Sequence, residues 1–206
     1  MKKHLLYAFK AFLAGVMISI GGFVYLSVGG LAGAIMFAVG LYVICVFGLN
    51  LYTGKVGIYL PANRSLISIF LLFEMWLMNL VGCFWSANVL HNFAKPEMLQ
   101  TVQDMVITKM NMPWLQLFVL GIFCGILMYS AVMGFAKTGN PLIVIFCVAT
   151  FIMCKFEHCI ADAFYCFLAR EYAWKVLIAV TLGNTFGAVI IPILGETNDE
   201  KKSTIL

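Results

Sequence analysis

Long apolar runs and short polar connections alternate along the whole chain. The runs cover residues 5–28, 31–52, 66–92, 114–136, 141–169 and 174–195. Each has roughly the 20 residues that a helix needs to cross a bilayer. Because the segments between them are short, the pattern predicts an all-α integral membrane protein of six transmembrane helices. We expect these helices to form a single domain, residues 1–206.

The composition agrees with this interpretation and leaves no room for a soluble domain. Hydrophobic residues make up 63% of the chain and charged residues only 11%, whereas about 25% of a typical soluble domain is charged. The first run is longer than the roughly 7–15 apolar residues of a secretory signal. We therefore expect it to be retained as a helix.

The distribution of basic residues sets the expected orientation. With both termini cytoplasmic, that side carries eight of them, namely Lys2, Lys3, Lys10, Lys55, Arg64, Lys137, Lys201 and Lys202. The opposite side then carries four, namely Lys95, Lys109, Arg170 and Lys175. This bias predicts an inner (plasma) membrane protein with both termini cytoplasmic. The net charge of +4 thus reflects topology, and it does not indicate a nucleic-acid partner.

Four ionisable residues interrupt the fifth apolar run. Lys155, Glu157, His158 and Asp162 lie within eight residues of one another. Ionisable groups at membrane depth are costly and usually line a polar path or pair with each other. The cluster is therefore a hypothesis for a functional site.

The second run ends in a sequence that weakens a helix. Three glycines and an asparagine lie between Phe47 and Gly57, and each glycine costs about 1 kcal/mol relative to alanine. One interpretation is a helix break with Thr53 turned toward a cavity, where irregular backbone is tolerated. The other is a simple helix end capped by Gly54.

Two short motifs indicate an internal repeat. Asn79-x-x-Gly82 and Asn184-x-x-Gly187 match at an offset of 105 residues, and the same offset takes Thr53 to His158. Residues 5–92 and 114–195 then form two copies of one unit. Since each copy has three spans, the copies run in opposite directions through the membrane. Inverted repeats place a substrate path near the midplane, often at broken helices.

These residues resemble the formate/nitrite transporter family over nearly the whole chain. The resemblance rests on Leu49-Asn50-Leu51-Tyr52-Thr53-Gly54, on Phe156-Glu157-His158-Cys159 and on the two Asn-x-x-Gly motifs. It implies six helices in two inverted three-helix repeats, an aquaporin-like arrangement with interrupted second and fifth helices. It also implies a homopentamer with one pore per protomer, a transport protein rather than an enzyme, and no cofactor or bound metal.

The resemblance also assigns candidate site residues. His158 matches the central histidine of the pore and Thr53 the threonine that faces it. Phe37, Leu41, Leu51 and Phe151 match apolar constrictions, and Lys109 matches a basic residue of the outer vestibule that attracts anions. Four further residues are candidate modulators: Asn50, Lys155, Glu157 and Asp162. In the family, Gly125 is often Asn, Asn50 often Glu, and Asp162 commonly Asn.

Helical spacing suggests how the modulators act. Asp162 lies four residues after His158 and would share its helical face, where its carboxylate could hold the imidazole. Lys155 could pair with Asp162 or Glu157, and Glu157 would face another way and stabilise the fold. These departures from the family pattern bear on which anion is favoured.

The leading hypothesis is a channel or proton-linked transporter for small monovalent anions such as formate, nitrite or hydrosulfide. A bare anion loses its hydration in an apolar constriction at high cost, whereas its neutral acid does not. His158 can donate and accept a proton near neutral pH. The alternatives are a water or neutral-solute channel, and a redox or metal protein using Cys154, His158 and Cys159.

Overall fold

The computed structural model describes residues 2–62 and 65–203, and the side chains of residues 3–60 and 65–193. Arg64, one of the basic residues that set the expected orientation, lies outside the described residues. All regular structure in the described part is helical. The helices are α1 Lys2–Val28, α2 Gly30–Phe47, α3 Tyr52–Ala62, α4 Leu66–His91, α5 Pro96–Asn111, α6 Trp114–Thr138, α7 Pro141–Met153, α8 Cys159–Leu168 and α9 Trp174–Ser203.

Most of the predicted apolar runs appear as single helices. Within the described residues, five helices are long and apolar enough to cross a membrane: α1, α2, α4, α6 and the 174–193 part of α9. The fifth run is instead divided between two shorter apolar helices, α7 and α8. Large apolar side chains such as Leu66, Phe73 and Phe146 are exposed on the helices, as expected for surfaces that face lipid.

Two pairs of helices pack closely, α1 with α4 and α6 with α9. The glycines of the two Asn-x-x-Gly motifs lie at these crossings. A Cβ atom added to Gly82 would overlap the backbone carbonyl of Phe12, and one added to Gly187 would overlap that of Ile122. Small residues at such positions allow helix backbones to approach in lipid. The motifs therefore fix helix crossings, and each crossing places the motif's asparagine in the core.

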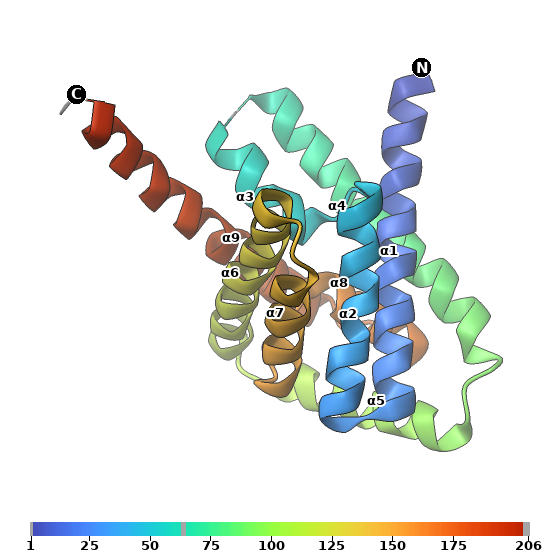
Figure 1. Cartoon of the computed structure of the whole chain (residues 1–206). Coiled ribbons are helices and arrows are strands. Elements are labelled where there is room, and N and C mark those ends of the chain that lie inside the picture. Colours follow the sequence, from blue (N-terminus) through green and yellow to red (C-terminus); the bar gives the residue numbers. More distant parts are fainter. Residues whose placement is uncertain (1, 63–64, 204–206) are drawn as a thin grey trace.

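Helix α5 crosses the end of the bundle that lies away from the start of α1 and the end of α9 (Figure 1). Its side chains Val102 and Val106 are fully buried, and Pro96 occupies its first turn, where the missing N–H costs nothing. Helix α5 packs on α8. This contact brings Lys109, near the end of α5, against the segment that carries His158.

Candidate functional site

The chain leaves helical geometry between α2 and α3. Helix α2 ends at Phe47, and Gly48 adopts a left-handed φ of 58°, which glycine tolerates without a Cβ clash. The non-helical segment therefore covers residues 48–51. Gly54, the expected cap if the helix simply ended there, lies inside α3. Thr53 lies in the first turn of α3 and is fully buried.

A second break separates α7 from α8 in the same way. Helix α7 ends at Met153, and Lys155 takes the left-handed conformation with φ 54°. Residues 154–158 are not helical. Glu157 therefore does not lie on a helix, and the expectation that helical geometry turns it away from His158 is wrong.

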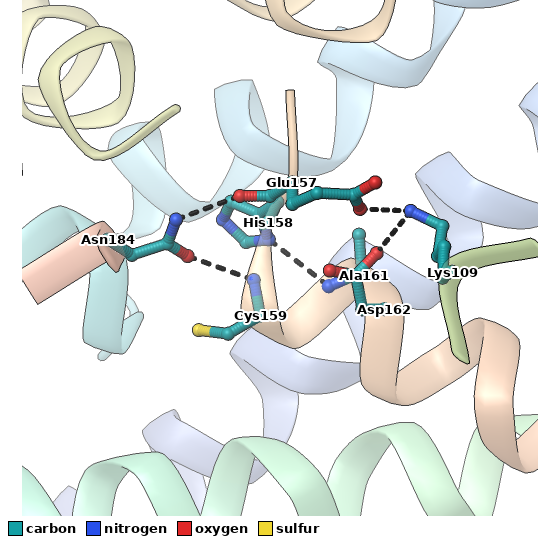
Figure 2. Close-up of polar contacts among 7 residues, drawn as sticks. All are labelled: Lys109, Glu157, His158, Cys159, Ala161, Asp162 and Asn184. Carbon is teal, nitrogen blue, oxygen red and sulfur yellow. Dashed lines mark hydrogen bonds and ion pairs between the residues drawn. The ribbon is translucent and has the colours of Figure 1, made fainter. Parts of the chain in front are cut away.

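Two buried asparagines anchor the breaks through matching hydrogen bonds. The Asn79 amide donates to the carbonyl of Asn50 (2.9 Å) and accepts from the Tyr52 N–H (2.9 Å). The Asn184 amide donates to the carbonyl of Glu157 (2.8 Å) and accepts from the Cys159 N–H (2.9 Å), as drawn in Figure 2. Each side chain thus replaces helical partners that the broken backbone has lost.

These bonds correct the pairing of residues between the two halves. They match Asn50 with Glu157 and Tyr52 with Cys159, an offset of 107 residues (50 to 157, 52 to 159). The same offset matches the two left-handed residues, Gly48 and Lys155. At this offset His158 corresponds to Leu51, whereas the offset of 105 predicted from the motifs pairs it with Thr53.

Thr53 and His158 nevertheless contact each other directly. His158 is the N-cap of α8, where its Nδ1 accepts the backbone N–H of Ala161 (3.1 Å). A neutral imidazole with an accepting Nδ1 carries its proton on Nε2. That Nε2 lies 2.8 Å from Thr53 Oγ1, so His158 donates to the threonine hydroxyl. The cap consumes one ring nitrogen and holds the imidazole in this neutral tautomer.

Aromatic rings surround the imidazole. Phe151 stacks on His158 with ring centroids 5.8 Å apart, and Phe37 meets Phe151 edge to face at 5.7 Å. Phe37 and Phe151 are buried, and so are Leu41 and Leu51. The structure thus brings Phe37, Phe151 and Thr53 together around His158, and it places Leu41 and Leu51 in the same buried core.

Lys109 lies between two carboxylates. Its Nζ donates to Glu157 and, at 2.9 Å, to Oδ1 of Asp162 (Figure 2). The side chains of Lys109, Glu157 and Asp162 are only 13%, 3% and 2% exposed. Lys109 is thus a mostly buried ion-pair partner, and it occupies the role that the sequence analysis gave to Lys155. The expected contact of the Asp162 carboxylate with the imidazole is also wrong, because that carboxylate binds Lys109.

A cavity of about 460 Å³ opens beside these residues, between α5 and the second break. Its walls include His158, Phe151, Lys109, Glu157 and Asp162. Lys155 also lines it. Of the candidate residues of the first half, Asn50 lies elsewhere, and its amide donates to the carbonyl of Tyr7 (3.0 Å). The cavity therefore gathers the candidates of the second half on one side of the buried Thr53–His158 pair.

The conformation of Lys155 gives a test of the second break. A left-handed backbone costs a non-glycine residue about 1–2 kcal/mol, so Lys155→Gly is expected to raise the free energy of unfolding by about 1 kcal/mol. Thermal unfolding of the purified protein in detergent measures the change. The matched control is Lys95→Gly, at the exposed helical N-cap of α5 with an ordinary φ of −71°. A lower unfolding temperature for Lys155→Gly would contradict the argument.

Gly125 and the two motif asparagines, Asn79 and Asn184, have structural roles beyond those expected from the sequence. A Cβ atom at Gly125 would overlap the backbone of Asn184, so this chain admits no side chain there. Asn79 and Asn184 were used only as repeat markers, although both are fully buried. A buried amide in an apolar span needs partners, and that requirement was the available signal for their role.

The alternative of a metal site loses its histidine ligand, since both ring nitrogens of His158 are engaged by protein groups. Within the described part of the chain, no three His, Cys, Asp or Glu residues form a group that could hold a metal ion.

Known proteins place the chain in a family. The family profile described as "Formate/nitrite transporter" matches residues 2–196. No curated protein sequence matches significantly. A solved structure titled "FNT family ion channel" is 22% identical, with a TM-score of 0.86 over 96% of this chain and 91% of that chain. Another, "Pentameric formate channel with formate bound", is 20% identical, with a TM-score of 0.82 over 97% of this chain and 98% of that chain. At these identities the structures establish the shared fold, while the profile covers nearly the whole sequence. The chain, a multi-pass membrane protein, therefore belongs to the formate/nitrite transporter family.

Proposed function

We propose that this protein is a channel or proton-linked transporter for small monovalent anions such as formate, nitrite or hydrosulfide. The observation that carries the proposal is the buried Nε2–H of His158, held by Thr53 among apolar rings at the side of a cavity. An anion that has lost water needs a hydrogen-bond donor in such surroundings. The two solved structures of similar fold, an ion channel and a formate channel, support this class of function.

The path runs from the cavity past Phe151 and Phe37 to His158 and Thr53, and then past Leu41 and Leu51. The Thr53 hydroxyl and the incoming anion compete for the same Nε2–H, since a neutral imidazole has one such donor. The Thr53 hydroxyl accepts this bond, so its own O–H can donate to the anion as a second donor. The N-cap contact of Nδ1 with Ala161 keeps the ring oriented throughout the exchange.

The proposal includes an architecture. The segments α2–α3 and α7–α8 form interrupted second and fifth spans, and residues 5–92 and 114–195 form two inverted three-helix repeats. The protein lies in the inner (plasma) membrane with both termini cytoplasmic, and it assembles as a homopentamer in the lipid bilayer. Two observations support this arrangement: the matching bonds of Asn79 and Asn184, and the pentameric formate channel of similar fold.

Flux into proteoliposomes tests the function. The panel of probes is formate, nitrite, hydrosulfide, lactate and chloride, measured against pH. We expect His158→Asn to lose most anion flux while remaining folded, because asparagine is a good N-cap but does not replace the Nε2–H donor. Thr53→Val, which removes only the hydroxyl, is expected to reduce flux as well.

The control for Thr53→Val is Thr138→Val, since Thr138 is exposed, and its hydroxyl donates within its own helical turn and accepts only the N–H of the neighbouring Asn140. Wild-type flux in both His158→Asn and Thr53→Val would overturn the pathway assignment. A wild-type flux that ignores pH and membrane potential would instead indicate a channel for neutral solutes or water.

A further inference from the structure

The ion cluster around Lys109 holds more negative than positive charge. One ammonium nitrogen binds Glu157 and Asp162 at the same time. Two carboxylates on one nitrogen lie close to each other, and like charges at that distance resist joint ionisation. We refer to Glu157 and Asp162 as the carboxylate pair.

One oxygen of this pair has no partner. Oδ1 of Asp162 accepts from Lys109, but Oδ2 is buried without a hydrogen-bond partner among the described residues. The residue is 2% exposed and lines the cavity. An ionised oxygen left without donors in a buried site is costly, whereas the neutral acid costs much less.

The charges that line the cavity are also unbalanced. It is bordered by two lysines, Lys109 and Lys155, and by three acidic residues, Asp104, Glu157 and Asp162. With all five ionised, the walls carry a net negative charge. A net negative charge on the walls repels an entering anion, so an anion would be disfavoured beside His158. One bound proton makes the walls neutral.

The groups around α8 leave Lys109 as the only described cation in contact with the pair. Helices α1, α4, α5 and α9 pack on α8. Their titratable groups include Tyr25 of α1, Cys83 and His91 of α4, Asp104 and Lys109 of α5, and the exposed Lys175 of α9, whose Nζ donates to the carbonyls of Met110 and Met112. Those of the α8 segment itself are Lys155, Glu157, His158, Cys159, Tyr165 and Cys166. The recorded ion pairs of Glu157 and Asp162 are both with Lys109.

We propose that the carboxylate pair binds one proton, on Oδ2 of Asp162, and that this proton makes the cavity neutral enough to admit an anion. The proton comes from cavity water, and the pair holds it because two carboxylates face one ammonium. Only the link between this proton and anion entry rests on the proposed function. Asp162 is then a determinant of anion entry, acting through the charge of the site rather than by contact with the imidazole.

Infrared spectroscopy of the purified wild-type protein at neutral pH tests the proton itself. We expect the C=O stretching band of a buried protonated carboxyl, which shifts in D₂O. Both Asp162→Asn and Glu157→Gln should lose the band, because each leaves one carboxylate for one ammonium. The control Asp104→Asn changes an exposed carboxylate and should keep it. Gel filtration confirms that each variant is folded, and the two substitutions serve as independent tests.

Formate flux tests the consequence. The ratio of Asp162→Asn flux to wild-type flux should rise severalfold with increasing pH, because the variant stays neutral when the wild type loses its proton. No band in the wild type, or a band that survives both substitutions, would overturn the proton site. A constant flux ratio would overturn its link to anion entry. Absence of anion flux in the wild type would instead defeat the proposed function, and the infrared result would still decide the proton site.

Discussion

Replacing Lys109 by Met is expected to destabilise the folded protein by about 3–5 kcal/mol, because removing one partner of a buried ion pair leaves uncompensated charge. Methionine keeps the length of the lysine stem and removes the ammonium that binds Glu157 and Asp162. The loss corresponds to a decrease in unfolding temperature on the order of 10 °C for a chain of this size. Thermal unfolding in detergent, followed by intrinsic fluorescence, measures it.

The pH dependence of the stability of Lys109→Met is a second test. Without Lys109, an ionised Glu157 or Asp162 has no cation beside it, and an unpaired buried charge is costly in the folded protein whereas the neutral acid is not. Stability therefore falls as pH rises, and the deficit relative to wild type is smallest in acid. The control is Lys95→Met, an exposed residue before α5, which should change stability by no more than about 0.5 kcal/mol. Equal unfolding temperatures for Lys109→Met and wild type would show that the cluster does not stabilise the fold.

The sequence predicts the helices well because bilayer-length apolar runs are a strong local signal. Helices α1, α4 and α6 coincide closely with predicted runs. The break in the second run was visible in its glycines, but its position was not. Gly48 and Gly54 are chemically alike, and only the left-handed φ of Gly48 distinguishes the cap.

The contacts within the site depend on distances between segments that are far apart in the chain. Lys109 meets Glu157 and Asp162 from 48 and 53 residues away, and helical spacing within the fifth run favoured Lys155 instead. Helical spacing applies only where the chain is helical, and the left-handed turn at Lys155 changes the direction of the side chains that follow it. For the same reason, Asp162 lies four residues after His158 but binds Lys109 and not the imidazole.

The offset of 105 residues did not predict which residues of the two non-helical segments correspond. The asparagines match at 105 residues, but the breaks match at 107, because the spacing from break to asparagine differs between the halves. A single offset cannot describe both. Thr53 and His158 lie together because Thr53 is in the first turn of α3, His158 caps the start of α8, and the two helix starts meet in the core.

Asn184→Leu is expected to destabilise the protein by about 3–6 kcal/mol and to abolish most anion flux. The side chain makes three buried hydrogen bonds: it donates to the carbonyls of Gly121 and Glu157 and accepts from the Cys159 N–H. Leucine has nearly the same volume but leaves the Glu157 carbonyl and the Cys159 N–H without partners, at about 1–3 kcal/mol each, and it also removes the additional bond to the Gly121 carbonyl inside α6. Since Glu157 and Cys159 flank His158, the loss also releases the imidazole from its position against Thr53. Thermal unfolding measures the first effect and formate uptake by proteoliposomes the second.

The matched control is Asn92→Leu, because Asn92 is exposed and its side chain bonds only to the carbonyl of Asn88 within its own turn. Asn79→Leu at the first break removes an equivalent set of three bonds and should destabilise the fold by a similar amount. Its effect on flux should be smaller than that of Asn184→Leu when both are compared at equal folded fraction, since the first break presents Leu51 where the second presents His158. Wild-type stability of Asn184→Leu would mean that the second break holds its shape without the amide. Equal flux losses in the two variants would mean that Asn184 acts through the fold alone, and not through the orientation of His158.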